Sequence, residues 1–294
     1  MPNERMAAVI AAALAEQLPP NVLLMRVLAE AEPGRNLPAL RREAGRLATA
    51  NDEDRTRLAD AERLLGAHPD AWRTVRAVLA EADHGAGPEG DGVARWEAVF
   101  DRLARTAPEA AVALYALGSP DLLAAATAEL VGALRDRRLT GPDRDVVEIG
   151  CGIGRISLAL AAEVRSVLGL DVSAGMIAEA ERRAVGTGNA RFRRTDGRDL
   201  SGIADRSVDL VLAADVFPYL VSAGDDLPGR HVAEAARVLR PAGALLILNY
   251  SYRGSLDRDR AEVGRLFARS GLRDEPAAFA LRLWDAAAFL AYAP

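Results

Sequence analysis

The sequence predicts an α/β protein, with a doubly wound sheet in its C-terminal part and an all-helical region before it. Up to about residue 140, apolar residues recur at helical spacing, and Pro, Gly, Asn or Asp separate the segments. Beyond that point, short apolar runs alternate with helical segments, and the first of these runs ends in a glycine-rich loop. This alternation is typical of parallel strands joined by helices.

The helical region is divided from the sheet region near residue 118. Ser119 and Pro120 are suited to be the N-cap and first residue of a helix that extends to Arg138. Because this helix leads directly into the first strand, we assign it to the second domain. The predicted domains are therefore residues 1–118, all-helical, and residues 119–294. Within the first, residues 85–92 are rich in glycine and predict an exposed loop.

Three roles are open for the helical domain. The first is a lid over the crevice that selects substrates, and the second is a helical scaffold for a protein partner. The third is an element for homodimerisation or stabilisation. Ligand sites favour domain interfaces, which supports the lid. No repeat with a period in the thirties is evident, which weighs against a repeat scaffold.

Composition narrows the function classes. The chain has 294 residues and 50% apolar content, enough for a large core, and its net charge of −5 weighs against a nucleic-acid partner. The sequence has no lysine, which excludes lysine Schiff-base chemistry. A single cysteine and three scattered histidines give no support to a disulfide or a metal site.

The chain is expected to be cytoplasmic. No run approaches the roughly 18 apolar residues that span a bilayer. The apolar N-terminal stretch from Met6 to Ala15 is followed by Glu16 and Gln17 and by no clear cleavage site, so we predict no signal peptide and no membrane association.

The first predicted strand, residues 146–149, contains Glu148 and is followed by Gly150, Gly152 and Gly154. Glycines at these positions permit a sharp turn and let a ligand approach the backbone. A dinucleotide fingerprint needs its third glycine one residue later, where Arg155 stands. A simple turn between strand and helix is the alternative.

Further strands follow in order. We predict them at residues 166–173, 190–194, 208–215, 244–249 and 286–292, with helices at residues 156–164, after an N-cap at Ser173, and around His231. Asp171, Asp196 and Asp215 lie at or just after the ends of three successive strands. In doubly wound sheets the carboxyl ends of the strands face the ligand crevice.

The pattern Glu-x-Gly-x-Gly-x-Gly at residues 148–154, together with these acids, resembles motif I and the following strands of the class I S-adenosylmethionine-dependent methyltransferases. The resemblance covers roughly residues 119–294. It implies a Rossmann-like, mostly parallel seven-stranded sheet with an antiparallel last strand. It also implies S-adenosylmethionine as cofactor, with S-adenosylhomocysteine as product.

The resemblance implies roles for individual residues. The glycine loop holds the methionine end of the cofactor, Asp171 accepts hydrogen bonds from the ribose hydroxyls, and Asp215 contacts the methionine ammonium group. Met176 packs on the adenine, Asp196 accepts from its amino group, and the main chain at Gly197 donates to the ring. The cofactor-binding candidates are Glu148, Gly150, Cys151, Gly152, Gly154, Asp171, Val172, Met176, Asp196, Gly197 and Asp215.

The catalytic candidates are His231, Tyr219 and Asp215. Methyl transfer needs a held donor, an aligned nucleophile and exclusion of water, and needs a base only if the acceptor loses a proton. His231 has a suitable pKa for a base, with an exposed or capping role as the alternative. Core packing is the alternative for Tyr219.

We therefore predict a methyltransferase that acts by in-line displacement on a small-molecule or peptide-like acceptor. The alternatives are a non-catalytic S-adenosylmethionine-binding sensor, a helical partner-binding protein with a vestigial cofactor fold, and a nicotinamide-dependent oxidoreductase. The misplaced third glycine disfavours the last.

Overall fold

The computed structural model describes residues 2–30, 36–47, 52–82, 91–276, 279 and 281–294. Contacts between residues divide the chain into two compact units. The first comprises Met1–Asp83, Glu109–Ala126 and Arg282–Asp285, and the second comprises His84–Pro108, Thr127–Leu281 and Ala286–Pro294. The predicted loop at residues 85–92 lies largely outside the described residues.

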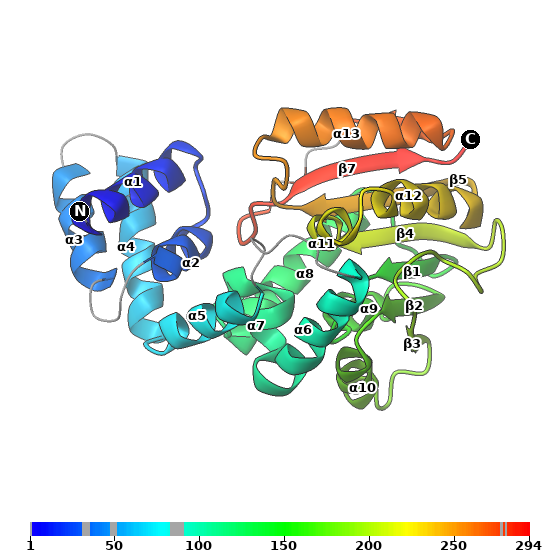
Figure 1. Cartoon of the computed structure of the whole chain (residues 1–294), viewed down its shortest axis with the longest axis horizontal. Helices are drawn as coiled ribbons and strands as arrows, with labels where there is room; N and C mark the ends of the chain where they lie inside the picture. Colours follow the sequence, from blue (N-terminus) through cyan, green and yellow to red (C-terminus); the bar gives the residue numbers. More distant parts are fainter. Residues whose placement is uncertain (1, 31–35, 48–51, 83–90, 277–278, 280) are drawn as a thin grey trace. The chain divides into compact units, whose positions relative to one another are not determined.

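The first unit is helical, as its periodicity predicts. The helices of this unit up to Glu81 are drawn in blue to cyan in Figure 1. Its described elements are α1 (Pro2–Ala15), α2 (Pro20–Glu30), α3 (Asn36–Leu47), α4 (Asp52–Ala67), α5 (Ala71–Glu81), most of α7 (Pro108–Val112) and a 3-10 helix (Leu114–Ala116).

A strap from the far end of the chain completes this first unit. The Asn21 side chain on α2, which is buried, donates from Nδ2 to the carbonyls of Tyr115 (3.0 Å) and Leu283 (2.8 Å). The rings of Tyr115 and Trp284 stack with centroids 5.4 Å apart. Three segments distant in sequence therefore share one packed core.

The second unit contains one seven-stranded sheet. Its strands are β1 (Asp145–Ile149), β2 (Ser166–Asp171), β3 (Ala190–Arg194), β4 (Val208–Ala214), β5 (Leu239–Asn249), β6 (Arg273–Glu275) and β7 (Ala287–Tyr292). Their order is β3-β2-β1-β4-β5-β7-β6, and β7 runs antiparallel to both neighbours. The predicted fold class, including the antiparallel last strand, is confirmed.

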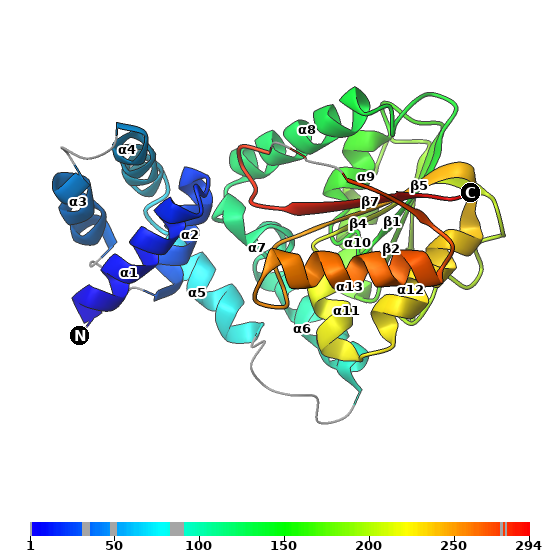
Figure 2. The same ribbon diagram turned by 90° about the horizontal axis from the view of Figure 1, so that it is seen from above.

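Helices cover both faces of this sheet. They are α6 (Gly92–Thr106), the later part of α8 (Pro120–Asp136), α9 (Arg155–Leu160), α10 (Ala174–Arg183), α11 (Phe217–Ala223), α12 (Leu227–Val238) and α13 (Leu256–Arg269). Figure 2 shows α8 and α9 on one face, and α12 and α13 on the other. The two-sided cover explains why Leu210–Ala213 in β4 are all apolar and have no exposed surface.

The division at residue 118 does not coincide with the division made by these contacts. Helix α6, which the sequence places in the helical domain, packs against α10 and α11 of the sheet unit. Conversely, the first turns of α8 belong to the helical unit. Amphipathic spacing indicates that a helix buries one face, but the partner of that face is a long-range property.

Helix α9 ends at Leu160, earlier than the helix predicted at residues 156–164, and a distant side chain binds carbonyls beyond its end. Asn189, which precedes β3, donates from Nδ2 to the carbonyls of Ala161 (2.8 Å) and Val164 (3.0 Å). None of the helices in the described residues has the length and apolar character needed to cross a bilayer.

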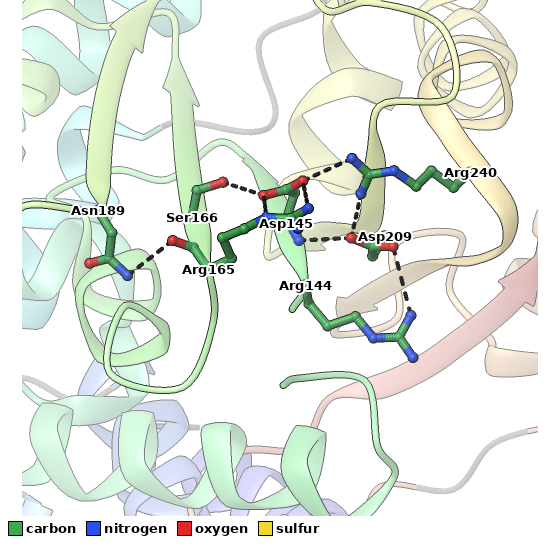
Figure 3. Close-up of polar contacts among 7 residues, drawn as sticks. All are labelled: Arg144, Asp145, Arg165, Ser166, Asn189, Asp209 and Arg240. Carbon is green, nitrogen blue, oxygen red and sulfur yellow. Dashed lines mark hydrogen bonds and ion pairs between the residues drawn. The ribbon is translucent and has the colours of Figure 1, made fainter. Parts of the chain in front are cut away.

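Charged side chains join the amino-terminal ends of the central strands (Figure 3). Arg240 of β5 binds Asp145 of β1 (2.9 Å) and Asp209 of β4 (2.5 Å). The Asp145 carboxylate also accepts from Arg165 Nε (2.8 Å), and the hydrogen bonds from Arg165 lower the pKa of Asp145. This network joins the amino-terminal ends of the strands, whereas the glycine loop, Asp171 and Asp215 lie at the opposite, carboxyl ends.

Candidate cofactor site

The loop after β1 contains three glycines with positive φ, and at Gly150 and Gly154 a side chain would also collide with neighbouring residues. Gly150, Gly152 and Gly154 have φ values of +66°, +52° and +75°, a region that favours glycine. A Cβ on Gly150 would lie 2.0 Å from Val216 Cγ2, and one on Gly154 would lie 2.7 Å from the Phe192 ring. The sharp turn predicted from the glycine spacing is present at the carboxyl edge of the sheet, where the Gly152 amide donates to Asp171.

Asp171, the last residue of β2, is bound to this loop. Its Oδ2 accepts from the Gly152 amide and its Oδ1 from the Ser173 amide, both at 2.9 Å. Burial raises the pKa of Asp171, and backbone hydrogen bonds from Ser173, Gly152 and Val172 oppose that effect. A carboxylate has about four acceptor positions on its two oxygens. These amides therefore fix the orientation of the carboxylate without using all of its acceptor capacity.

Glu148 lies within the sheet and is buried. Its Oε2 accepts a 2.5 Å hydrogen bond from Ser157 Oγ on α9. Burial raises the pKa of Glu148 to about 7, because a charged carboxylate loses its hydration there. Cys151, next to the glycines, is also buried, and burial raises the pKa of its thiol. Both groups are thus largely or wholly neutral below pH 7.

The residues after β2 and β3 lie against one another. Gly197 has a φ of +70°, and a Cβ on it would lie 2.4 Å from Val172 Cγ1. The exposed Asp196 side chain accepts from the Arg198 amide at 3.0 Å. Val172 is partly exposed, whereas Met176 on α10 has no exposed surface. The apolar surface available at this edge therefore comes from Val172.

The carboxyl end of β4 brings Asp215 and Tyr219 to the same edge of the sheet. Asp215 has a φ of +57°, and its amide donates to the Leu248 carbonyl of β5 at 2.7 Å. The Tyr219 ring packs edge-on against Trp96 and Phe100 of α6, with centroids 4.7 and 5.1 Å apart. Burial raises the pKa of Tyr219, so the phenol stays protonated at neutral pH.

His231 lies in the core side of α12. Its side chain is 3% exposed, and Nδ1 lies 2.9 Å from the Leu227 carbonyl one turn earlier. Because a carbonyl only accepts, Nδ1 carries the proton. Burial lowers the pKa of His231, so the ring is neutral at physiological pH.

Helix α6 supplies residues that the sequence analysis missed. Asp101 Oδ1 accepts from Ser173 Oγ (2.6 Å) and from the Gly175 amide (2.9 Å), directly after Asp171. Trp96 Nε1 donates to Ser222 Oγ (2.7 Å) on α11. The helix therefore joins the segments that follow β2 and β4. Trp96 and Phe100 are four residues apart, so the sequence shows that α6 has an apolar face. It does not show which elements that face packs against.

Across the described ranges, no three His, Cys, Asp or Glu side chains come together in a way that could hold a metal ion.

Comparison with known proteins places this site in a family. Residues 147–247, from β1 into β5, match the family model described as a methyltransferase domain. The sheet region is a class I S-adenosylmethionine-dependent methyltransferase domain. The family uses S-adenosylmethionine as its methyl donor. The glycine turn and the oriented Asp171 carboxylate fit that cofactor.

Individual relatives share only part of the chain. A ribosomal RNA large subunit methyltransferase G of Streptomyces avermitilis is 34% identical over 48% of this chain and 37% of its own. A demethylmenaquinone methyltransferase of Clavibacter sepedonicus is 29% identical over 52% of this chain and 57% of its own. Among solved structures, phosphoethanolamine N-methyltransferase 1 of Haemonchus contortus is 25% identical with a TM-score of 0.48, over 54% of this chain and 32% of its own. The chain thus spans less than two thirds of the length of these relatives.

Proposed function

We propose that this protein transfers the methyl group of S-adenosylmethionine to a nucleophilic atom of a small-molecule or peptide-like acceptor. The observation that carries the proposal is the Asp171 carboxylate, held by the Gly152 and Ser173 amides beside the glycine loop. This loop follows β1, where the strand order reverses between β1 and β4. Ligands bind at such switch points in open α/β sheets.

The residues that would hold the cofactor lie along the carboxyl edge. The glycine-loop backbone would take the methionine end, Asp171 the two ribose hydroxyls, and Asp196, Gly197 and Val172 the adenine. When bound, the cofactor supplies an electrophilic methyl group on a sulfonium. The contribution of the chain is to hold that group, exclude water and align the acceptor.

We assign the acceptor side to the end of β4. Tyr219, a protonated phenol among aromatic rings, would orient the acceptor by donating a hydrogen bond. Asp215 would hold the methionine ammonium group by charge. We assign His231 to the packing of α12, because its ring is buried and Nδ1 is engaged by Leu227. The net charge of −5 supports a small acceptor over nucleic acid.

Replacing Asp171 with alanine tests this assignment. We expect S-adenosylmethionine to bind more weakly by about 1.5–3 kcal/mol, because hydrogen bonds to a charged acceptor are lost. That loss corresponds to roughly a 10- to 150-fold increase in Kd, measured by isothermal titration calorimetry. Asp136→Ala, which removes an exposed carboxylate at the end of α8, is the matched control and should bind normally.

Two results would contradict the proposal. One is no binding of S-adenosylmethionine or S-adenosylhomocysteine by folded wild-type protein, and the other is equal affinity in wild type and Asp171→Ala. Tight binding without turnover against any acceptor tested would favour the non-catalytic sensor instead.

A further inference from the structure

A groove rich in arginine lies along α13 of the sheet unit. It has a volume of about 440 Å³ and is lined by Arg253, Arg258, Ala261, Glu262 and Arg265. Four of these residues lie on α13, and Arg253 lies in the loop between β5 and α13. Helix α13 packs on β6 and β7 beside α12, and Figure 2 shows these two helices on the same face of the sheet. Three guanidinium groups against one carboxylate leave the groove with a positive charge.

Arg253 is held in place before any ligand arrives. Its guanidinium binds Glu262 through two parallel hydrogen bonds, Nε to Oε2 and Nη2 to Oε1, both 2.8 Å. Its backbone amide donates to Asp259 Oδ1 at 2.9 Å, and the Tyr252 amide donates to Asp259 Oδ2 at 3.3 Å. Asp259 has no exposed surface. A buried carboxylate thus fixes the loop that carries Arg253.

Arg258 and Arg265 also line the groove, and their guanidinium N–H groups can donate to a ligand. They are seven residues apart on α13, about two helical turns, so they lie on the same face of the helix. Neither makes an ion pair within 4 Å among the described residues, although the charge of Arg265 helps to lower the pKa of Glu262. Ala261 lies between the two arginines in the helix and also lines the groove. Guanidinium forks match the geometry of phosphate oxygens.

We propose that this groove is a binding site for a small phosphorylated molecule, with its phosphate held between Arg258 and Arg265 and oriented by Arg253. The volume lies within the range of small-molecule sites, about 300–1,000 Å³. A nucleic-acid backbone would need a row of cationic groups, and the net charge of the chain is −5. Phosphate binding here does not depend on methyl transfer.

The location connects this groove with the proposed reaction. Strand β5 ends at Asn249, beside Asp215, whose amide donates to Leu248, and the loop to Arg253 leaves from the same edge of the sheet. If the phosphorylated molecule is the methyl acceptor, which rests on the proposed function, the groove anchors its phosphate at the margin of the site.

The test is calorimetric titration of the full chain with inorganic pyrophosphate at low salt and without S-adenosylmethionine. We expect saturable binding, weakened about tenfold or more in both Arg258→Gln and Arg265→Gln, because each loses a charge-assisted fork. Arg260→Gln is the matched control, since it removes an exposed arginine of the same helix outside the groove. Its affinity should stay within about twofold of wild type.

Other outcomes would overturn the proposal. No saturable binding, or an equal loss in all three variants, would mean that only the general field of α13 attracts anions. Tighter binding of a single-stranded RNA oligonucleotide, lost in the same two groove variants, would replace the small molecule with nucleic acid. Circular dichroism of each variant checks that these exposed substitutions leave the fold intact. Because S-adenosylmethionine is absent, this result is independent of the outcome for Asp171→Ala.

Discussion

Trp284→Ala is expected to lower the free energy of unfolding of the helical unit by about 3–5 kcal/mol, the usual cost of truncating a buried large aromatic side chain. Trp284 is 4% exposed and stacks on Tyr115, which is also buried. Its neighbour Leu283 accepts the hydrogen bond from the buried Asn21 amide. Loss of the ring therefore leaves a cavity and loosens the strap whose Leu283 carbonyl accepts from Asn21 Nδ2.

Urea unfolding followed by far-UV circular dichroism measures this loss. Trp284→Phe, which keeps an aromatic ring against Tyr115, should lose less stability than Trp284→Ala. Trp72→Ala on α5 is the matched control in the same unit, because Trp72 is partly exposed and lies beside Arg73. A loss below about 1 kcal/mol in Trp284→Ala, equal to that of the control, would show that the strap does not contribute to the core.

A fragment of residues 1–118 should be less stable than the same helices in the full chain. It lacks the Leu283 carbonyl and the Trp284 ring, which the helical unit takes from the other end of the sequence. Hydrogen exchange of α2 measures the difference, because Asn21 lies on that helix. Equal protection in the fragment and the full chain would contradict this dependence.

The stability of the sheet unit is expected to fall as pH rises between about 4.5 and 7, because of Glu148. Burial raises the pKa of Glu148 from 4.5 to about 7 in the folded protein. Over this interval the folded state binds the proton while the unfolded state releases it, so rising pH favours unfolding. The difference between the two pKa values corresponds to about 3 kcal/mol of folding stability, which is present below pH 4.5 and completely lost above pH 7.

Glu148→Gln isolates this contribution. Glutamine resembles the protonated acid and can still accept a hydrogen bond from Ser157, so the variant should lack the decline. Between pH 5 and pH 8, chemical denaturation should give a fall in wild-type stability about 2–3 kcal/mol larger than that in the variant. Glu181→Gln, an exposed position on α10, should follow wild type. Parallel pH curves for wild type and Glu148→Gln would contradict the role of burial.

Strands that are short apolar runs ending in an acid or a turn were predicted closely from the sequence. A strand without an apolar run was missed. Ser166–Asp171 and Ala190–Arg194 are strands as expected, and Ser173 is the N-cap of α10, accepting from the Met176 amide at 3.0 Å. Strand β6, Arg273–Glu275, was missed because three charged, mostly exposed residues show neither an apolar run nor alternation. It is a strand only because β7 pairs with it.

The sequence by itself determined the glycine turn and the acids at the strand ends, because positive φ at glycine and the end of an apolar run are local properties. Only the tertiary structure decided which helix covers that edge and which segment completes the helical unit. The apolar face of α6 is readable in the sequence, but its packing against Tyr219 is not. The hydrogen bonds that Asp101 of the same helix accepts from Ser173 and Gly175 are not readable either. The same holds for the strap, since contacts between residues 21 and 283 depend on how the whole chain returns on itself. Periodicity reports that a face is buried, and the identity of its neighbour is fixed by the packing of the complete fold.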